Sequence, residues 1–200
     1  MSADLKGHAS SPAKTGAALW FTGLPGCGKS TLALAVKKAL AAKGVEAELL
    51  EMDARRRGYG TFSGYSQEER HGAYRMFADE AAVLAGQGRL VLMDATAPEL
   101  AMRRYARERI PRFAEVHLRC RVATAMAREA ARPQGMIMAG LYAKAVKRKA
   151  TGQKFEGLGQ VIGVDVPFEE DQRAELILEE GLDMTRAVDL ILARFASWWS

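Results

Sequence analysis

A glycine-rich segment near the start of the chain carries residue types that bind phosphate groups. Residues 19–31, LWFTGLPGCGKST, contain the pattern G-x-x-x-x-G-K-[ST]. Glycines let successive backbone N–H groups converge on a phosphate, the N-terminus of a following helix adds positive potential, and the lysine adds a cation. An ordinary glycine-rich turn is the alternative, but the apolar run before it and the helical pattern after it favour a nucleotide site. We therefore predict that nucleotide phosphates bind Gly23, Leu24, Pro25, Gly26, Cys27, Gly28, Lys29, Ser30 and Thr31.

Two acidic residues follow apolar runs that are typical of buried strands. Asp53 comes shortly after residues 45–50, and Asp94 ends residues 89–94. The carboxyl ends of parallel strands meet at one edge of a sheet, which is where such sheets bind ligands. A carboxylate there can hold Mg²⁺ or accept a proton from a reacting hydroxyl. We predict that Ser30, Asp53 and Asp94 hold the metal, while a structural or helix-capping role for Asp94 stays equally open.

The second half of the chain carries basic residues in an arrangement typical of a lid over phosphates. Arg128 and Arg132 are four residues apart on a predicted short helix, so they share one face. A predicted basic helix at 140–154 includes Lys144 and is followed by a glycine-rich stretch. We predict a hinged lid over about 128–168, in which Arg128 and Arg132 contact the nucleotide phosphates. A salt-bridged surface is the alternative for these two arginines.

Other polar residues are expected to be structural. The arginines of the helix that begins at Pro98, at positions 103, 104, 107 and 109, are expected to form a solvated face. Residues 55–60, RRRGYG, are expected to form a basic loop without regular structure. His117 lies in a strand of alternating pattern and is expected among core residues rather than as a metal ligand.

Apolar strands alternate with helical segments along the chain. Strands are predicted at 17–22, 45–50, 89–94, 113–120 and 175–179, and helices from the glycine-rich loop to 43 and at 66–85, 98–110, 124–132, 140–154 and 185–199. This alternation predicts an α/β protein with the three-layer P-loop NTPase fold, a parallel five-stranded sheet and a helical or loop lid. We expect residues 1–16 to be a disordered leader and residues 17–200 to form a single domain.

Composition restricts the partners and the compartment. The chain has 29 Lys and Arg against 24 Asp and Glu, a net charge of +5, which suits an anionic partner. No long basic block or zinc-finger pattern is present, so we expect no nucleic-acid partner. Cys27 and Cys120 are the only cysteines, and one of them lies in the phosphate loop, so we expect no disulfide. Without a signal peptide or an apolar run long enough to cross a bilayer, the protein is expected to be cytoplasmic, with no membrane partner.

Several blocks of the sequence resemble one family, the adenylylsulfate kinases, which phosphorylate the 3′-hydroxyl of adenosine 5′-phosphosulfate (APS) with MgATP. FTGLPGCGKSTLA is similar to their P-loop, LLEMDARRRG to their D-G-D-N-x-R segment, and GYSQEERHGAYR to their G-F-S-x-x-D-R-x-x-N-x-R segment. ATAP stands where the family has F-I-S-P, GLYAKA resembles G-L-Y-K-K-A, and IGVDVPFEE resembles T-G-I-D-x-P-Y-E. The likeness spans Leu19 to about Leu178. It implies ATP, Mg²⁺ and a small anionic nucleotide as ligands, and it allows a homodimer.

The resemblance also implies roles for individual residues. Lys29 and Asp53 stand at catalytic positions, Asp53 as the base for the attacking hydroxyl. Arg56 and Arg70 match arginines that grip the phosphosulfate. The implied substrate-binding positions together are Arg56, Tyr65, Arg70, Arg75 and Lys144, with Tyr65 in place of an aromatic residue that stacks on adenine.

Departures from the family pattern cluster on the acceptor side. Ala54 and Ala73 replace two asparagines, Ala97 replaces the serine of F-I-S-P, and Met52 replaces the glycine of D-G-D. Losing a buried hydrogen-bonding group costs roughly 1–3 kcal/mol where its partner stays unsatisfied. We therefore interpret the ATP half of the site as intact and the acceptor half as remodelled. The second adenine-stacking residue, Phe155 or none, stays open.

Three functions fit these observations. The leading one is phosphorylation of APS by ATP. The second is the same chemistry on another nucleotide or an activated sugar, such as a cytidine diphosphate derivative, because positions 54, 73 and 97 would permit it. The third, from a different class, is a regulatory protein that binds ATP without being a kinase. Retention of Asp53, Arg56, Arg70 and Lys144 disfavours the third, because a pure sensor needs no acceptor site.

Overall fold

Five parallel strands form the centre of the molecule. The computed structural model describes residues 16–62, 64–131 and 140–199. Its strands are β1 (Ala17–Thr22), β2 (Ala47–Glu51), β3 (Leu90–Asp94), β4 (Phe113–Leu118) and β5 (Leu176–Leu178), and their order across the sheet is β2-β3-β1-β4-β5. Every neighbouring pair is parallel, so the carboxyl ends of all five strands lie at the same edge. The predicted α/β architecture with a five-stranded parallel sheet is confirmed.

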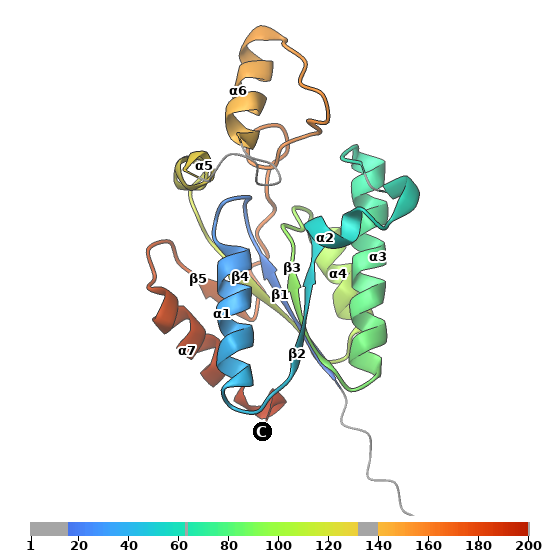
Figure 1. Ribbon diagram of the computed structural model, residues 1–200, viewed down its shortest axis with the longest axis vertical. Coiled ribbons are helices and arrows are strands. Elements are labelled where there is room, and N and C mark those ends of the chain that lie inside the picture. Colours follow the sequence, from blue (N-terminus) through green and yellow to red (C-terminus); the bar gives the residue numbers. More distant parts are fainter. Residues whose placement is uncertain (1–15, 63, 132–139, 200) are drawn as a thin grey trace, which may run out of the picture.

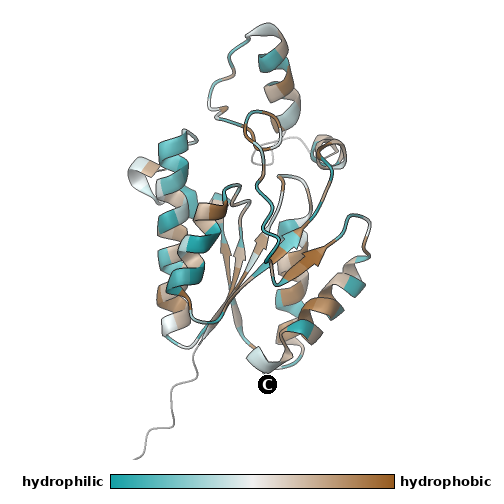
Figure 2. Ribbon diagram, turned by 180° about the vertical axis from the view of Figure 1, so that it is seen from behind, coloured by the Kyte–Doolittle hydropathy of each residue, from teal (hydrophilic) through white to brown (hydrophobic). Residues whose placement is uncertain are grey.

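Helices cover both faces of the sheet and complete three layers (Figure 1). Helices α1 (Lys29–Ala41) and α7 (Met184–Arg194) lie on one face, and α3 (Gln67–Gly86) and α4 (Leu100–Arg109) lie on the other. Strand side chains alternate between faces, so Leu19 and Phe21 of β1 pack into the core beside α1, and Trp20 packs into the core beside α3. Figure 2 shows the apolar strands enclosed by helices whose outward faces are largely hydrophilic.

The shorter elements lie mostly at the carboxyl edge of the sheet. They are α2 (Met52–Arg56), α5 (Val122–Ala130), α6 (Leu141–Thr151) and the 3₁₀ turns Gly60–Phe62 and Ala196–Trp198. Helices α5 and α6 stand beyond the strand ends, in the region of the predicted lid (Figure 1). Residues 132–139 of that lid, with Arg132, lie outside the described residues. None of the described helices is both long and apolar enough to cross a bilayer.

A capping box fixes the start of α3, the helix that carries the acceptor-side residues. The Ser66 hydroxyl accepts a hydrogen bond from the Glu69 amide at 3.2 Å, and the Glu69 carboxylate accepts one from the Ser66 amide at 2.9 Å. Each side chain satisfies a backbone donor that the helix leaves free. This start was predicted from the sequence, and the structure confirms it.

Three expectations about local structure were wrong. Arg55 and Arg56 lie in α2 rather than in a loop, because this short helix turns Met52 and Arg56 inward. Arg103 is not on a solvated face: its side chain is 1 % exposed and pairs with Glu115 of β4. Helix α7 ends at Arg194 instead of 199, and a 3₁₀ turn follows it.

Two further expectations about polar or terminal residues can be compared with the structure. His117 is 3 % exposed and lies in β4, which confirms its place in the core. Residues 1–15 of the predicted leader lie outside the described residues. Gly16 belongs to the folded domain, because its amide donates to the Ala85 oxygen at 3.1 Å and a Cβ there would lie 2.3 Å from the Arg89 oxygen.

Candidate active site

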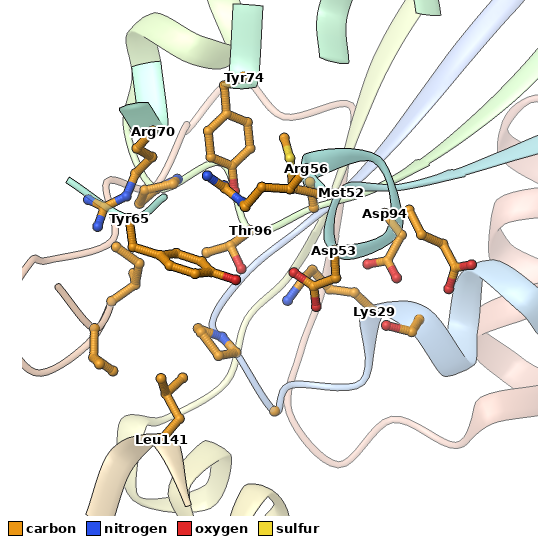
Figure 3. Close-up of a pocket in the computed structure, with 18 of the residues that line it drawn as sticks. Lys29, Met52, Asp53, Arg56, Tyr65, Arg70, Tyr74, Asp94, Thr96 and Leu141 are labelled. Atoms are coloured by element: carbon orange, nitrogen blue, oxygen red, sulfur yellow. The ribbon is translucent and has the colours of Figure 1, made fainter. Parts of the chain in front are cut away.

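A pocket opens at the carboxyl ends of β1, β2 and β3, next to α5 and α6. Its cavity holds about 170 Å³. On one side the lining comes from the P-loop, α2 and β3, and on the other side from α2, the turn before α3 and α3 itself. Figure 3 shows these two groups across the cavity from each other. They include Lys29, Ser30, Asp53 and Asp94 on the first side and Arg56, Tyr65, Arg70 and Tyr74 on the second.

The P-loop has the backbone that a phosphate site requires. Gly28, the N-cap of α1, has φ 106°, a left-handed conformation that glycine adopts without strain. A Cβ on Gly26 would lie 2.5 Å from the Ala125 oxygen, so only glycine lets α5 approach this closely. The N-terminus of α1 points its free N–H groups into the same concavity. The glycines predicted to shape the loop are therefore required by its geometry.

Lys29 lies folded back along the P-loop. Its side chain is almost fully buried, and its Nζ donates to the backbone oxygens of Gly23 at 3.1 Å and Leu24 at 2.9 Å. These bonds hold the ammonium group inside the loop and at the wall of the pocket. A cation held there can stabilise charge that develops on a transferring phosphoryl group.

Acidic side chains line the same pocket as Ser30, the first hydroxyl residue of α1. The β2–β3 register pairs Glu51 with Asp94, and Asp53 follows in the first turn of α2. Burial raises the pKa of Asp94, while Lys29 and a hydrogen bond with Ser30 lower it. In Figure 3, Asp53 lies beside Lys29 in the cavity.

This donor set fits Mg²⁺ held together with a nucleotide. Hydroxyl and carboxylate oxygens are the ligands that Mg²⁺ prefers, and such sites use one or two carboxylates and substrate phosphates. Within the described ranges, no group of three or more His, Cys, Asp or Glu residues is placed to hold a metal ion alone. The assignment of Ser30, Asp53 and Asp94 to the metal stays a prediction.

Two buried guanidinium groups dominate the acceptor side. Arg56 is 5 % exposed and Arg70 is 4 % exposed. Arg56 donates from Nη1 to the Gly64 oxygen at 2.8 Å, and Arg70 donates from Nη2 to the Gln160 oxygen at 3.0 Å. Among the described residues, Nε of Arg56 and Nη1 of Arg70 have no hydrogen-bond partner. Burial lowers the pKa of Arg70, and unpaired donors of this kind suit an anionic ligand.

Two tyrosines complete this side of the pocket. The Arg56 guanidinium lies 4.8 Å from the centre of the Tyr65 ring, and burial raises the pKa of Tyr65. The Tyr74 hydroxyl accepts a hydrogen bond from the Ala97 amide at 2.8 Å, and burial raises the pKa of Tyr74 to about 12. Both phenols therefore stay neutral at physiological pH. The Tyr65 ring offers a flat surface at the pocket wall, as stacking on a base requires.

Helices α5 and α6 contact the backbone of the P-loop beyond the carboxyl ends of the strands. Arg128 donates from Nη1 to the Cys27 oxygen at 3.2 Å, and the Tyr142 hydroxyl donates to the Pro25 oxygen at 2.9 Å. The buried Glu129 carboxylate accepts from the Leu141 amide at 3.0 Å and so joins the two helices. The predicted lid therefore contacts the donor side through two hydrogen bonds, and a third joins its two helices to each other.

The chain that follows α6 contacts the acceptor side. Arg148 donates to the oxygens of Leu158 at 2.9 Å and Gly159 at 3.0 Å, and it pairs with Asp165 at 2.5 Å. A Cβ on Gly159 would lie 2.1 Å from Cβ of Tyr65, so this loop touches the tyrosine directly. Arg148 thereby shapes the loop that bears Gln160, the partner of Arg70.

Of the predicted residues outside the P-loop, three do not line the pocket. The described lining also lacks five of the predicted P-loop residues, Gly23, Leu24, Cys27, Gly28 and Thr31. Arg75 follows Arg70 by five residues, about 140° round the helix, and its guanidinium lies 5.6 Å from the Tyr105 ring centre in a separate surface groove. Lys144 is exposed on α6, and Arg128 reaches the P-loop from outside the cavity. Phe155, the open choice for a second stacking residue, is also absent from the described lining.

Sequence reasoning missed several lining residues. They are Tyr74, Thr96, Glu129, Leu141 and Gln160. Tyr74 follows Arg70 by four residues on α3, so helical spacing could have placed it on the same face. Gln160 and Glu129 reach the pocket only through the tertiary fold, and nothing in their sequence context indicates it.

Comparisons with known proteins agree with this site. The chain matches the family described as adenylylsulphate kinase over residues 15–179. It is 34 % identical over 161 residues to a probable adenylyl-sulfate kinase of Archaeoglobus fulgidus, covering 80 % of this chain and 94 % of that one. It is 33 % identical over 187 residues to the adenylyl-sulfate kinase of Paraburkholderia xenovorans, covering 92 % of this chain and 96 % of that one.

A solved structure has the same fold. The APS kinase of Mycobacterium tuberculosis, in complex with AMPPNP and APS, is 28 % identical with a TM-score of 0.75, covering 91 % of this chain and 98 % of that one. The predicted P-loop kinase fold is thereby confirmed. With the family match over most of its length, the chain belongs to the adenylylsulphate kinase family of P-loop kinases.

Proposed function

We propose that this protein transfers the γ-phosphoryl group of ATP to the 3′-hydroxyl of APS, releasing ADP and 3′-phosphoadenosine 5′-phosphosulfate. The observation that carries the proposal is one pocket with two differently built sides. A P-loop with a buried Lys29 forms the donor side, and the unpaired donors of Arg56 and Arg70 form the acceptor side. APS carries both an anionic group and an adenine, which these arginines and Tyr65 can bind. The two relatives compared above are named probable adenylyl-sulfate kinase and adenylyl-sulfate kinase, names that describe this same reaction.

Each residue has a role that follows from its position. The acceptor oxygen attacks the γ-phosphorus, the bond from that phosphorus to the β,γ-bridging oxygen breaks, and ADP leaves. Asp53 takes the hydroxyl proton, and Lys29 stabilises the charge on the transferring group. Arg56 and Arg70 hold the phosphosulfate, and Tyr65 lies against the adenine. Ser30, Asp53 and Asp94 would hold Mg²⁺, which would supply charge neutralisation at the phosphates.

Two observations support a second candidate for the phosphoryl acceptor. Ala73 is fully buried beside Tyr74, and Met52 lines the pocket where the family pattern has glycine. The acceptor side of this chain is therefore more apolar than the family pattern implies. A related nucleotide or an activated sugar is the second candidate.

Coupled measurement of ADP release separates these functions. Purified protein is given MgATP with APS, with other nucleotides, with nucleotide-activated sugars, or with no acceptor. Release stimulated by APS well above every other acceptor supports the proposal. Stimulation by a different acceptor alone identifies the second candidate, and release without acceptor preference contradicts every kinase version. The homodimer allowed by the resemblance stays a prediction, which light scattering of the same sample tests.

A further inference from the structure

Arg103 is a buried arginine of α4 that does not line the pocket. Its side chain is 1 % exposed. It donates from Nη1 to the backbone oxygen of Ala97 and from Nη2 to the backbone oxygen of Glu169. Its Nε lies 3.1 Å from Oε2 of Glu115, and its guanidinium lies 5.0 Å from the centre of the Phe168 ring. One side chain therefore contacts three segments that are far apart in the sequence.

The first of these segments is a strained turn at the pocket wall. Ala97 has φ 46° and is the one non-glycine residue with positive φ in the described part of the chain. A left-handed alanine costs about 1–2 kcal/mol and persists only where neighbours hold it. Here Tyr74 accepts the Ala97 N–H, and Arg103 donates to the Ala97 oxygen. The turn presents Thr96 and Pro98 to the pocket.

The second segment is the chain that returns from the predicted lid. The Glu169 amide donates to the Pro98 oxygen at 2.8 Å, and the Glu169 carboxylate accepts from the Leu100 amide at 2.7 Å. Arg103 holds the carbonyl of the same residue. Glu169, in what we call the return segment, is thus hydrogen-bonded to Pro98 and Leu100, at the end of the Thr96–Pro98 turn, which we call the acceptor turn. Arg103 contacts both the acceptor turn and the return segment.

The third segment is β4, whose Glu115 side chain in turn contacts the end of β1 that enters the P-loop. The Thr22 hydroxyl donates to Oε1 of Glu115 at 2.6 Å, and Thr22 directly precedes Gly23. The Gly23 amide in turn lies 3.5 Å from the Thr96 oxygen. Glu115 is fully buried, so its pairing with Arg103 offsets the cost of placing two charges away from water. The pair connects the start of the donor loop to the acceptor turn.

We propose that Arg103 is a positioning residue for the acceptor: it fixes the Thr96–Pro98 turn and the return segment of the lid at the distance from the P-loop that transfer requires. The proposal rests on the proposed function for the identity of the acceptor. A buried ion pair that served stability alone would have no need of carbonyl contacts to the turn at the pocket wall and to the segment that returns from the lid. An error of about 1 Å in such a segment can cost about 10²-fold in rate.

Arg107 provides a matched control. It lies one turn further along α4 and forms a bidentate ion pair with Glu175, in which Nη2 lies 3.0 Å from Oε2. Its guanidinium lies 5.0 Å from the centre of the Phe113 ring. It has the same chemistry as Arg103, but among the described residues its hydrogen bonds go to Glu175 and not to Ala97 or Glu169. Arg103→Lys and Arg107→Lys therefore differ in the segments they loosen.

The test compares KM for each substrate with stability. In Arg103→Lys we expect KM for APS to rise at least about tenfold while KM for ATP changes less than about twofold, whereas Arg107→Lys should lower the melting temperature without separating the two KM values. A rise of both KM values together, or the same pattern in Arg107→Lys, overturns the proposal.

A second variant keeps the proposal testable if Arg103→Lys does not fold. It changes Glu169, an exposed residue of the same contact. Glu169→Ala removes the carboxylate that binds the Leu100 amide, and we expect it to raise KM for APS selectively, though less than Arg103→Lys. Glu170→Ala, which instead removes a partner of Arg119, is its control and should leave KM unchanged. An unchanged KM in Glu169→Ala contradicts the proposal.

Hydrogen exchange separates failure of this proposal from failure of the proposed function. The amides of Ala97, Leu100 and Glu169 are all hydrogen-bonded in this contact. We expect them to exchange faster in Arg103→Lys than in Arg107→Lys, whichever acceptor the protein uses. If wild-type protein does not turn over APS, the proposed function fails, and the KM comparison is made with the acceptor that the panel identifies. Equal exchange in both variants contradicts the positioning role.

Discussion

Arg128 of α5 donates a hydrogen bond from Nη1 to the backbone oxygen of Cys27, 3.2 Å away in the P-loop. The guanidinium is therefore held at the edge of the donor side, although it does not line the cavity. Because arginine carries five N–H donors, we expect others of this side chain to bind a phosphate that occupies the loop. This contact joins a helix of the predicted lid to the backbone that is predicted to bind ATP.

Replacing Arg128 by alanine should weaken ATP binding. We expect KM for ATP to rise about tenfold, because a hydrogen bond to a charged group contributes about 1.5–3 kcal/mol, while KM for the acceptor changes little. Arg121→Ala is the control: this residue directly precedes the same helix, but its side chain is 83 % exposed and pairs with Glu180. Equal KM values for ATP in both variants would show that Arg128 only stabilises α5.

Replacing Asp53 by asparagine should stop transfer and spare nucleotide binding. Loss of a general base lowers rates by about 10²–10⁴-fold, and asparagine keeps the shape of the side chain in the first turn of α2. ADP release measures turnover, and titration with a fluorescent ATP analogue measures affinity. Wild-type turnover in this variant would refute the role of Asp53 as the base.

Replacing Asp94 by asparagine should raise the need for Mg²⁺. Asp94 is buried next to Ser30 and Lys29, so a metal ligand or a hydrogen-bonding neighbour of one is expected there. We expect the Mg²⁺ concentration for half-maximal turnover to rise roughly tenfold, with EDTA abolishing activity in both proteins. An unchanged Mg²⁺ requirement would favour the structural role for Asp94.

Replacing Arg70 by alanine should affect the acceptor, whereas replacing Arg75 should not. Arg70 is buried at the pocket with an unpaired Nη1, while Arg75 lies over Tyr105 on another face of α3. Losing a charge-assisted bond of about 2 kcal/mol corresponds to about a 30-fold rise in KM for the acceptor. Arg75→Ala should stay within about twofold of wild type. A large effect at Arg75 would restore the role that the resemblance implies for it.

His117 should make the protein less stable in mild acid. Burial lowers the pKa of His117 to about 4 from 6.5, so the unfolded chain binds a proton between these pH values that the folded protein does not. Stability is therefore complete above about pH 6.5 and falls as the pH drops toward 4, by at most roughly 3 kcal/mol from this residue. Urea unfolding at pH 7 and pH 5 measures the fall. The His117→Gln variant should lose part of it, and an identical fall in both proteins contradicts this origin.

The sequence alone was sufficient for the features that depend on local pattern. The P-loop, the capping box at Ser66, the apolar runs of β1 and β3 and the alternating pattern of β4 each combine residue type with spacing. These determine backbone conformation within a few residues. The parallel sheet follows because strands alternate with helices. The blocks around Asp53, Arg56 and Arg70 were enough to indicate the family, and the comparisons confirmed it.

Only the tertiary structure decided which polar side chains face the pocket and which are buried elsewhere. Arg103 and Arg109 lie on the same helix and look alike in sequence, yet Arg103 is buried because Glu115, a residue of β4, lies opposite it. Arg70 and Arg75 are separated by the rotation of α3 about its axis. Gln160 and Glu129 reach the pocket because α5, α6 and the following loop fold back over the strand ends. Such contacts join residues far apart in the chain, so no local pattern records them.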